Sequence, residues 1–365
     1  DQLKAISSDV NTVVHAGAGS GKTLVLAHRY VRLIREKKAD VESILTVTFT
    51  RKAAAEMYER IYYLLSEYAH EPQVKKQLER FDQARISTLD SFCASIVRDW
   101  SSWYGIPPTF TQEEEENQRI AEEVGLSFLL DNIDGDPLRE LTRKAGFDRV
   151  WKELLASLAL KHLPLGMHHD FSEVFRMQQD HLLEHLGSSM KRLHSLTQEI
   201  LRLDGAAGKS ISEAQEVIET GPDLMQLAKE CGEEPSSADE LKEALERLRS
   251  VRNVGNVSKP DLLSFKELFS EIKNELIPPL QRLAGSLAVQ EKQEQLLLLC
   301  GQFQDVYHLE KRRRGVLSYQ DIQQMAVTIL REHPRARDFY KSLYRYILID
   351  EFQDNNRLQK QLLYL

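Results

Sequence analysis

Residues 16–23 read Ala-Gly-Ala-Gly-Ser-Gly-Lys-Thr and follow the short apolar run 12–14. In this order, small residues let backbone N–H groups close around phosphates, Lys22 reaches the β- and γ-phosphates, and the Thr23 hydroxyl coordinates Mg²⁺. A helix beginning near Lys22 adds its dipole to the same anion site. An ordinary glycine turn that caps a helix is the alternative. We expect a strand, a loop and a helix that hold a nucleoside triphosphate through Ala16, Gly17, Ala18, Gly19, Ser20, Gly21, Lys22 and Thr23.

Composition sets the class of protein. The 365 residues suggest about two domains or slightly more. The net charge of −8 argues against coating nucleic acid by bulk electrostatics, but leaves room for a local binding track. Three cysteines without metal-site spacing indicate reduced thiols in a cytoplasmic protein, with Mg²⁺ as its metal. No apolar run approaches the ~18 residues that span a bilayer, so no membrane role is expected.

The order of apolar runs predicts a parallel α/β layout with an insertion. Strands are expected at 12–15, 44–48 and 86–88, alternating with helices that begin at Lys22, Lys52 and Ser91. Pro107 and Pro108 interrupt this pattern, and almost every periodic segment from there to about Gly315 is helical. A strand returns at 346–350. We therefore divide the chain into residues 1–108, 109–315 and 316–365.

Two helices of the insertion can be read individually. Leu241, Ala244, Leu245, Leu248 and Val251 form one apolar stripe, behind a predicted capping box at Ser237 and Glu240. A second stripe follows Phe265 and is expected to stop at Pro278. Both stripes indicate core helices, with a partner-binding groove as the alternative.

Hydrolysis of a nucleotide also requires carboxylates. Asp350 and Glu351 follow the predicted strand 346–350, and ligands collect where parallel strands end. A strand ending at Asp350 beside the one ending near His15 would bring its carboxylate to Thr23 and a metal ion. We expect Asp350 to bind Mg²⁺ and Glu351 to act as the base on the attacking water. A solvent-exposed helix cap is the alternative interpretation of the pair.

Four further segments add to the loop at 16–23. Gln2 lies near the start, and residues 46–57 read Thr-Val-Thr-Phe-Thr-Arg-Lys-Ala-Ala-Ala-Glu-Met. Residues 86–93 read Ile-Ser-Thr-Leu-Asp-Ser-Phe-Cys, and residues 350–354 read Asp-Glu-Phe-Gln-Asp. In this order, the segments resemble the motifs of UvrD/Rep-type superfamily 1 DNA helicases. Residues 104–110 and 314–322 resemble the AddA/RecB branch, the helicase–nucleases.

The resemblance implies a fold and a nucleotide site. The fold would be α/β: a partial RecA-like P-loop domain with a parallel sheet, residues 1–108 and 316–365, interrupted by an all-helical insertion at 109–315. ATP and Mg²⁺ would be bound, with Gln2 reading the adenine and Lys22, Asp350 and Glu351 as the catalytic residues.

The resemblance also implies single-stranded DNA across the carboxyl ends of the strands. A base can stack on Phe49 while hydroxyls and an ammonium meet phosphate oxygens. The contacts would come from Thr48, Phe49, Thr50, Lys52, Thr88 and Ser91. Phe49 buried at a strand end is the alternative.

Some residues depart from the family pattern or leave their role open. Asp90 stands where many relatives have histidine, and an acid there cannot attract phosphate without a metal or a basic neighbour. Trp100 and Trp103 are expected at a hinge rather than under bases. The basic run 311–314 is expected on a solvated helix face.

The parent protein would unwind duplex DNA from 3′ to 5′ in repair and recombination, and a second helicase–nuclease subunit is a candidate partner. Asp1 in place of an initiator Met, and an apolar helical pattern at Leu365, indicate a fragment. We expect weak nucleotide binding and negligible turnover from it alone. Two alternatives remain: a helical protein-interaction module with a vestigial nucleotide site, and a P-loop ATPase that does not translocate.

Overall fold

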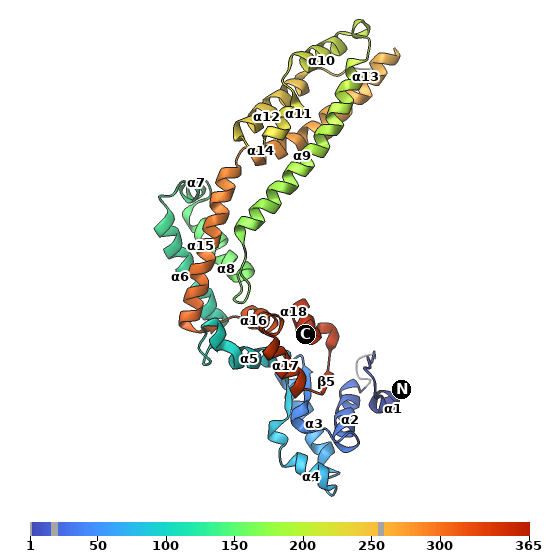
Figure 1. Ribbon diagram of the computed structural model, residues 1–365, viewed down its shortest axis with the longest axis vertical. Coiled ribbons are helices and arrows are strands. Elements are labelled where there is room, and N and C mark those ends of the chain that lie inside the picture. The colour runs from blue at the N-terminus through green and yellow to red at the C-terminus, as the bar shows by residue number, and fades with distance from the viewer. Residues whose placement is uncertain (1, 16–20, 255–258) are drawn as a thin grey trace. The chain divides into compact units, whose positions relative to one another are not determined.

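The computed structural model describes residues 2–15, 21–254 and 259–365 (Figure 1). These residues form two compact units. The first comprises residues 1–131, 145–168 and 304–365, and the second comprises 132–144 and 169–303. This division groups 109–131, 145–168 and 304–315 with the sheet, whereas the sequence grouped them with the helical insertion.

A three-stranded parallel sheet lies at the centre of the first unit, in the order β2 (Arg85–Thr88), β1 (Ile44–Thr48) and β5 (Tyr346–Ile349). Thr48 is paired with Thr88 and Val47 with Ile349. All five residues of β1 are buried, as expected of a strand covered on both faces. The strands predicted at 44–48, 86–88 and 346–350 are therefore present, with bounds within two residues.

The strand predicted at 12–15 is not formed. Residues 11–15 have no regular structure, and the Val13 side chain is 95% exposed. Among the described residues, β5 pairs with β1 alone. An isolated run of four residues gains no ladder hydrogen bonds and buries no side chain, so its β-propensity alone does not make a strand.

Helices cover both faces of the sheet with separate cores. On one face, Ile44 and Leu348 pack with Tyr30 of α2 and Ile61 of α3. On the other face, Leu45 and Val47 pack with side chains of α5, α16 and α18. The helices of this unit are α1 (Gln2–Ser7), α2 (Lys22–Arg35), α3 (Arg51–Ser66), α4 (Pro72–Leu78), α5 (Leu89–Trp100), α6 (Glu114–Asn132), α8 (Ser157–His162), α16 (Tyr319–Glu332), α17 (Pro334–Leu343) and α18 (Arg357–Tyr364).

A second, two-stranded sheet joins the two ends of the predicted insertion. β3 (Thr111–Gln112) pairs in parallel with β4 (Val316–Leu317). Residues 109–315 are therefore not all-helical, because β3 lies within them. The pairing brings together the two segments that the sequence singled out at the entrance and the return of the insertion.

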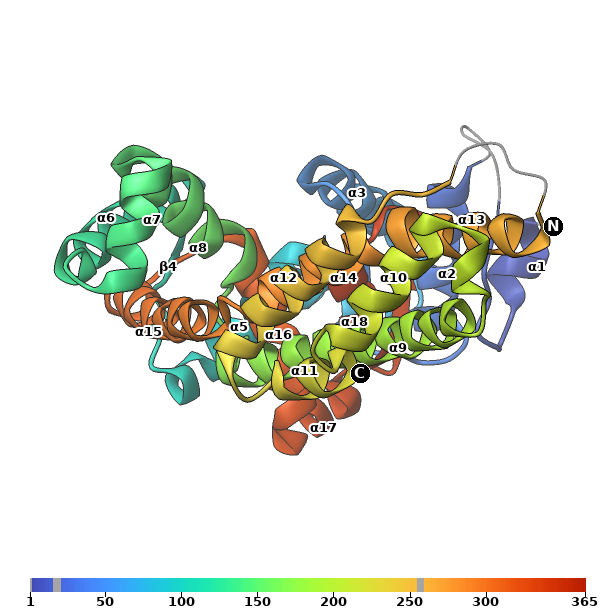
Figure 2. The ribbon, with the colours of Figure 1, turned by 90° about the horizontal axis from the view of Figure 1, so that it is seen from above.

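Every element that the structure describes in the second unit is helical. Around α9, the helices α12 and α14 pack side by side, as Figures 1 and 2 both show. Their shared core includes Leu193, Leu241, Phe269 and Leu280. The helices are α7 (Asp136–Ala145), α9 (Phe171–Leu201), α10 (Lys209–Thr220), α11 (Leu224–Glu230), α12 (Pro235–Ser250), α13 (Pro260–Glu271) and α14 (Ile277–Leu287), with α15 (Gln290–Arg314) contributing to both units.

The predicted apolar stripes are core, but two predicted helix ends are wrong. The stripe from Leu241 to Val251 is buried, whereas Ser237 lies inside α12 and is itself buried, so it caps nothing. The second helix does not stop at Pro278. It continues through a π-helical segment, Ile272–Leu276, into α14, whose first turn accommodates proline because its N–H groups lack helical partners anyway.

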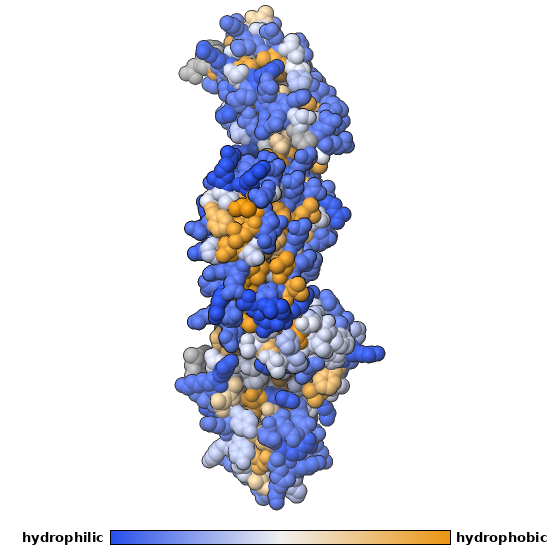
Figure 3. All heavy atoms as spheres, turned by 90° about the vertical axis from the view of Figure 1, so that its left-hand side faces the viewer, coloured by the Kyte–Doolittle hydropathy of each residue, from blue (hydrophilic) through white to orange (hydrophobic). Residues whose placement is uncertain are grey.

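The surface is mostly hydrophilic, with one gathering of apolar side chains in the middle of the view in Figure 3. In that region Leu130 of α6 and Leu154 of the π-helical segment Arg149–Ala156 are 55% and 45% exposed. Across 2–15, 21–254 and 259–365, no helix has the length and apolar character needed to cross a bilayer.

Candidate functional site

Thr23 and Asp350 are 327 positions apart in the sequence, yet their side chains meet. Thr23 Oγ1 donates a hydrogen bond to Asp350 Oδ2 at 3.2 Å. Asp350 directly follows β5, and its backbone N–H donates to the Val47 carbonyl of β1 at 2.9 Å. The central strand therefore holds a carboxylate, only 9% exposed, against the first turn of α2.

The chemistry of this pair fits magnesium. A hydroxyl and a carboxylate supply oxygen ligands, and Mg²⁺ uses one or two carboxylates together with water and substrate phosphates. Within the part of the chain that the structure describes, no three or more His, Cys, Asp or Glu side chains gather as a metal cage. A pair of oxygen ligands without such a cage is what Mg²⁺ shared with a nucleotide requires.

The N-terminus of α2 borders the same place. Gly21 precedes the helix with φ at 81°, a conformation that glycine adopts without penalty. Lys22 and Thr23 form the first turn and are half-buried. The predicted loop residues Ala16, Gly17, Ala18, Gly19 and Ser20 lie outside the described residues.

Gln2 lies beside this helix terminus. A Cβ atom on Gly21 would be 3.3 Å from Gln2 Nε2, so the glutamine amide borders the end of the predicted loop. The helix that carries Gln2 is anchored to α2, because Arg29 donates to the Ala5 carbonyl at 2.6 Å and Arg32 to the Ile6 carbonyl at 3.2 Å. The glutamine predicted to read a base is thus brought to the loop.

Glu351 has the left-handed backbone conformation, with φ at 51° and ψ at 44°. This conformation costs a non-glycine residue roughly 1–2 kcal/mol. Its N–H donates to Asp350 Oδ1 at 3.1 Å, and its carboxylate accepts from Gln353 Nε2. Strained backbone of this kind often occurs at functional sites, and here it separates the directions of two adjacent carboxylates.

The six residues predicted to contact DNA gather at the carboxyl ends of β1 and β2. Phe49 is 55% exposed at the end of β1, so it is not buried. Thr50 caps α3 and Thr88 caps α5, each accepting from a backbone N–H at 3.1 Å. Thr88 Oγ1 also lies 2.8 Å from Ser91 Oγ. Thr48, paired with Thr88, is buried, and the Lys52 side chain is 87% exposed.

Asp90 has partners that the sequence did not suggest. Its Oδ1 accepts hydrogen bonds from Gln323 Nε2 at 2.8 Å and from Gln359 Nε2 at 2.9 Å. The only signal available for these glutamines was the pattern Asn356-x-x-Gln359, which forms a capping box at the start of α18. Neither a metal nor a basic group is needed to explain an acid at position 90.

The basic run is not a uniformly solvated helix face. Lys311 is 1% exposed and forms a buried ion pair with Asp321 of α16. Burial lowers the pKa of Lys311 even though Asp321 opposes this effect. Arg313 and Arg314 do lie nearer the surface, paired with Glu310. A side chain near a helix end can point inward, and its charge does not reveal this.

The two tryptophans pack within the first unit. The Trp103 ring lies 5.0 Å from the Trp100 ring and 4.2 Å from His333, centroid to centroid. Tyr104 Oη and His333 Nε2 are 3.0 Å apart. The rings join α5 to the start of α17, which agrees with a packing role.

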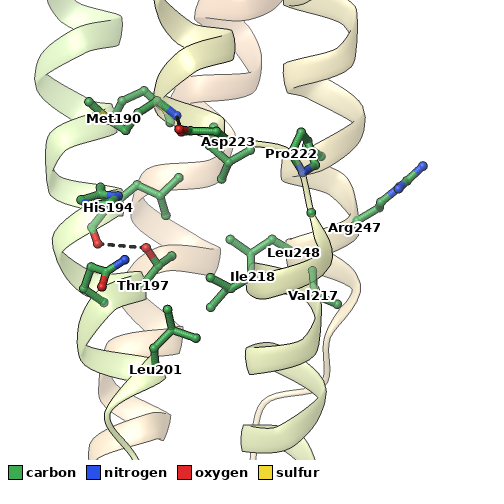
Figure 4. A pocket seen from close by; sticks show the side chains of 16 residues that line it. Met190, His194, Thr197, Leu201, Val217, Ile218, Pro222, Asp223, Arg247 and Leu248 are labelled. Carbon is green, nitrogen blue, oxygen red and sulfur yellow. Dashed lines mark hydrogen bonds between the residues drawn. The ribbon is translucent and has the colours of Figure 1, made fainter.

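A cavity of about 330 Å³ lies in the second unit, between α9, α10 and α12 (Figure 4). Its walls are largely apolar and include Met190, Ile218 and Leu248. The charged groups at its margin are engaged: Asp223 caps α11, and Arg247 pairs with Glu243 of its own helix and points away from the cavity. It brings no chemistry to the Thr23–Asp350 pair.

The fold and this pair define an α/β protein in which a parallel sheet brings the threonine of a glycine-rich loop to an acidic strand end. The chain belongs to the UvrD/REP helicase N-terminal domain family, whose model matches residues 1–185 and 167–365.

Several similar proteins are each named as the A subunit of an ATP-dependent helicase/nuclease. The protein from Syntrophomonas wolfei is 28% identical over all of this chain, and that from Staphylococcus epidermidis is 27% identical over 96% of it. The protein from Anoxybacillus flavithermus is 26% identical over the whole chain. The chain spans 32–34% of the length of these relatives.

Proposed function

We propose that this chain is the N-terminal part of an ATP-dependent DNA helicase that hydrolyses ATP as it moves along single-stranded DNA. The observation that carries the proposal is the hydrogen bond between Thr23 and Asp350, which joins a loop suited to phosphates to a carboxylate suited to Mg²⁺. Membership of the UvrD/REP family and the shared name of the relatives support it.

Each residue of the nucleotide site has a defined task in this proposal. Lys22 holds the β- and γ-phosphates, and Gln2 contacts the adenine. Thr23 and Asp350 would hold Mg²⁺, which when bound neutralises charge on the phosphates. Glu351 orients the attacking water and takes its proton. Its left-handed backbone keeps this carboxylate from following Asp350 into the same contact.

The DNA track lies at the same edge of the sheet. Phe49 stacks on a base, while Thr48, Thr50, Lys52, Thr88 and Ser91 contact the backbone. Support comes from the exposure of Phe49 and Lys52 and from the alignment of Thr48 with Thr88. ATP and DNA would then contact consecutive segments of β1, β2 and β5.

The wider proposal concerns the parent protein. It unwinds duplex DNA from 3′ to 5′ in repair and recombination and works with a second, different polypeptide, since the relatives are named as one lettered component of a helicase/nuclease. Residues 1–108 and 316–365 would form its first RecA-like domain, with 109–315 inserted between them.

The test is ATP hydrolysis by the full-length parent, with and without single-stranded DNA. Glu351→Gln should lower the stimulated rate by roughly 10²- to 10⁴-fold while retaining bound nucleotide, because the general base is lost and the phosphate contacts are kept. Glu79→Gln, on an exposed position after α4, is the matched control and should keep the wild-type rate.

Three outcomes would contradict the proposal. An unchanged rate in Glu351→Gln would remove the assigned base. Hydrolysis without stimulation by DNA would favour an ATPase that does not translocate, and no nucleotide binding at all would favour a vestigial site.

A further inference from the structure

Asp90 lies in the first turn of α5, between two residues of the proposed DNA track. Thr88 caps that helix and Ser91 follows Asp90 directly. We call residues 88–91 the Thr88 turn. A carboxylate in this turn repels phosphate, so its presence needs another reason.

The structure supplies that reason in two convergent hydrogen bonds. Gln323 of α16 and Gln359 of α18 both donate to Asp90 Oδ1, at 2.8 and 2.9 Å. Both glutamines are buried, being 9% and 7% exposed. Hydrogen bonds to an ionised acceptor in such a place are stronger than neutral ones. The carboxylate is therefore engaged inside the protein.

The same glutamines are joined by Asn356. Its Nδ2 donates to Gln323 Oε1 at 2.8 Å, and its backbone N–H donates to Gln359 Oε1 at 3.0 Å. Gln359 N–H returns a bond to Asn356 Oδ1 at 2.9 Å. Each amide of Gln323 and Gln359 thus uses both its oxygen and its nitrogen.

Asn356 ends the segment that begins with Asp350. We call residues 350–356 the Asp350 loop. Helix α16 contacts both α5 and α18, as Figure 1 also shows, so the network crosses the contact between these three helices. Through it, the proposed DNA turn and the proposed metal and base residues share a set of satisfied polar contacts.

A satisfied buried network of this kind has one favoured arrangement, and a shift at either end breaks several bonds together. We infer that Asp90 is a positioning residue that couples DNA binding at the Thr88 turn to nucleotide binding at the Asp350 loop. The inference rests on the proposed function, because it requires both ligands to bind where that proposal puts them.

Coupling is measured as a ratio of affinities. Binding of a fluorescent oligothymidylate to the full-length parent is titrated by anisotropy, with and without a non-hydrolysable ATP analogue and Mg²⁺. In the wild type the two dissociation constants should differ by about fivefold or more, in either direction. In Asp90→Ala the ratio should fall to within about twofold of one, while each ligand still binds.

Asp90→Asn distinguishes the network from simple repulsion. Asparagine keeps an oxygen that accepts from both glutamines but loses the charge, so it should restore most of the wild-type ratio. If Asp90 only repels phosphate, Ala and Asn should both tighten DNA binding equally and leave the ratio unchanged. Asp82→Asn, at an exposed position before β2, is the matched control. Gln323→Leu, which removes the other side of the network, should repeat the Asp90→Ala result.

The outcomes separate the two proposals. If the wild type binds neither ligand, the proposed function fails, and the inference with it. If both ligands bind but the wild-type ratio is one, or Asp90→Ala and Gln323→Leu retain it, the function stands and the inference is wrong. Thermal unfolding followed by circular dichroism shows whether each variant is folded.

Discussion

Single residues at the ends of β1 and β5 carry the proposed chemistry. Asp350 is held by a backbone bond to Val47 and by the Thr23 hydroxyl, so its carboxylate has a defined position before any ligand binds. Glu351 next to it is held by a strained backbone and by Gln353. Preorganised groups of this kind need little rearrangement during a reaction.

Phe49 allows the most direct test at this scale. Phe49→Ala should raise the dissociation constant for single-stranded DNA by about 5- to 150-fold, since stacking contributes roughly 1–3 kcal/mol per base. Anisotropy titration with labelled DNA measures the change. Tyr63→Ala removes another exposed ring, from α3, and should have little effect. Equal losses in the two variants would show that the ring at position 49 has no special place in the track.

At the scale of elements, the junction of α15 and α16 stands out. Asp321 accepts from Lys311, from Ser318 and from the Leu165 N–H, which lies 2.7 Å away. One turn before Lys311, His308 is also buried. Burial lowers the pKa of His308 to about 4, and its Nε2–H donates to the Leu163 carbonyl at 3.2 Å. Polar groups here fix how the return of the insertion meets the sheet unit.

Lys311→Met should destabilise the first unit by about 3 kcal/mol, because it leaves the Asp321 carboxylate buried without its cation. Urea unfolding followed by tryptophan fluorescence measures the loss. Arg313→Met, on the exposed side of the same helix, should leave the midpoint unchanged. If Lys311→Met also leaves it unchanged, the ion pair is not buried in solution.

For the whole molecule, the two units have separate hydrophobic cores. Each core buries large apolar side chains, which is the main source of stability in any domain. Trp100, Trp103 and Trp151, the only tryptophans of the chain, all belong to the first unit. Helices occur in both units.

This distribution predicts two unfolding transitions. Tryptophan fluorescence should follow only the first unit, whereas far-ultraviolet circular dichroism should follow the helices of both, so the two curves should not coincide in urea. The Lys311→Met variant should shift the fluorescence curve and the matching part of the dichroism curve alone. Coincident curves would show that the two cores unfold as one.

Local patterns predicted much of this fold. Strands β1, β2 and β5, the start of α2 and the apolar stripe of α12 follow from spacing, because hydrophobic periodicity acts over a few residues. Helix ends were less predictable. Ser237 is buried inside α12 rather than at its cap, and Pro278 fits the first turn of α14, since packing overrides a local stop signal.

The sequence by itself determined the glycine-rich loop, the acidic strand end and the family to which both belong, because each is a short run of residue types with its own chemistry. Only the tertiary structure decided that residues 12–15 stay outside the sheet, that Lys311 is buried and that Asp90 faces two glutamines. These outcomes depend on partners distant in the sequence, or on which face of a helix meets a neighbour. Neither is a property of the local sequence.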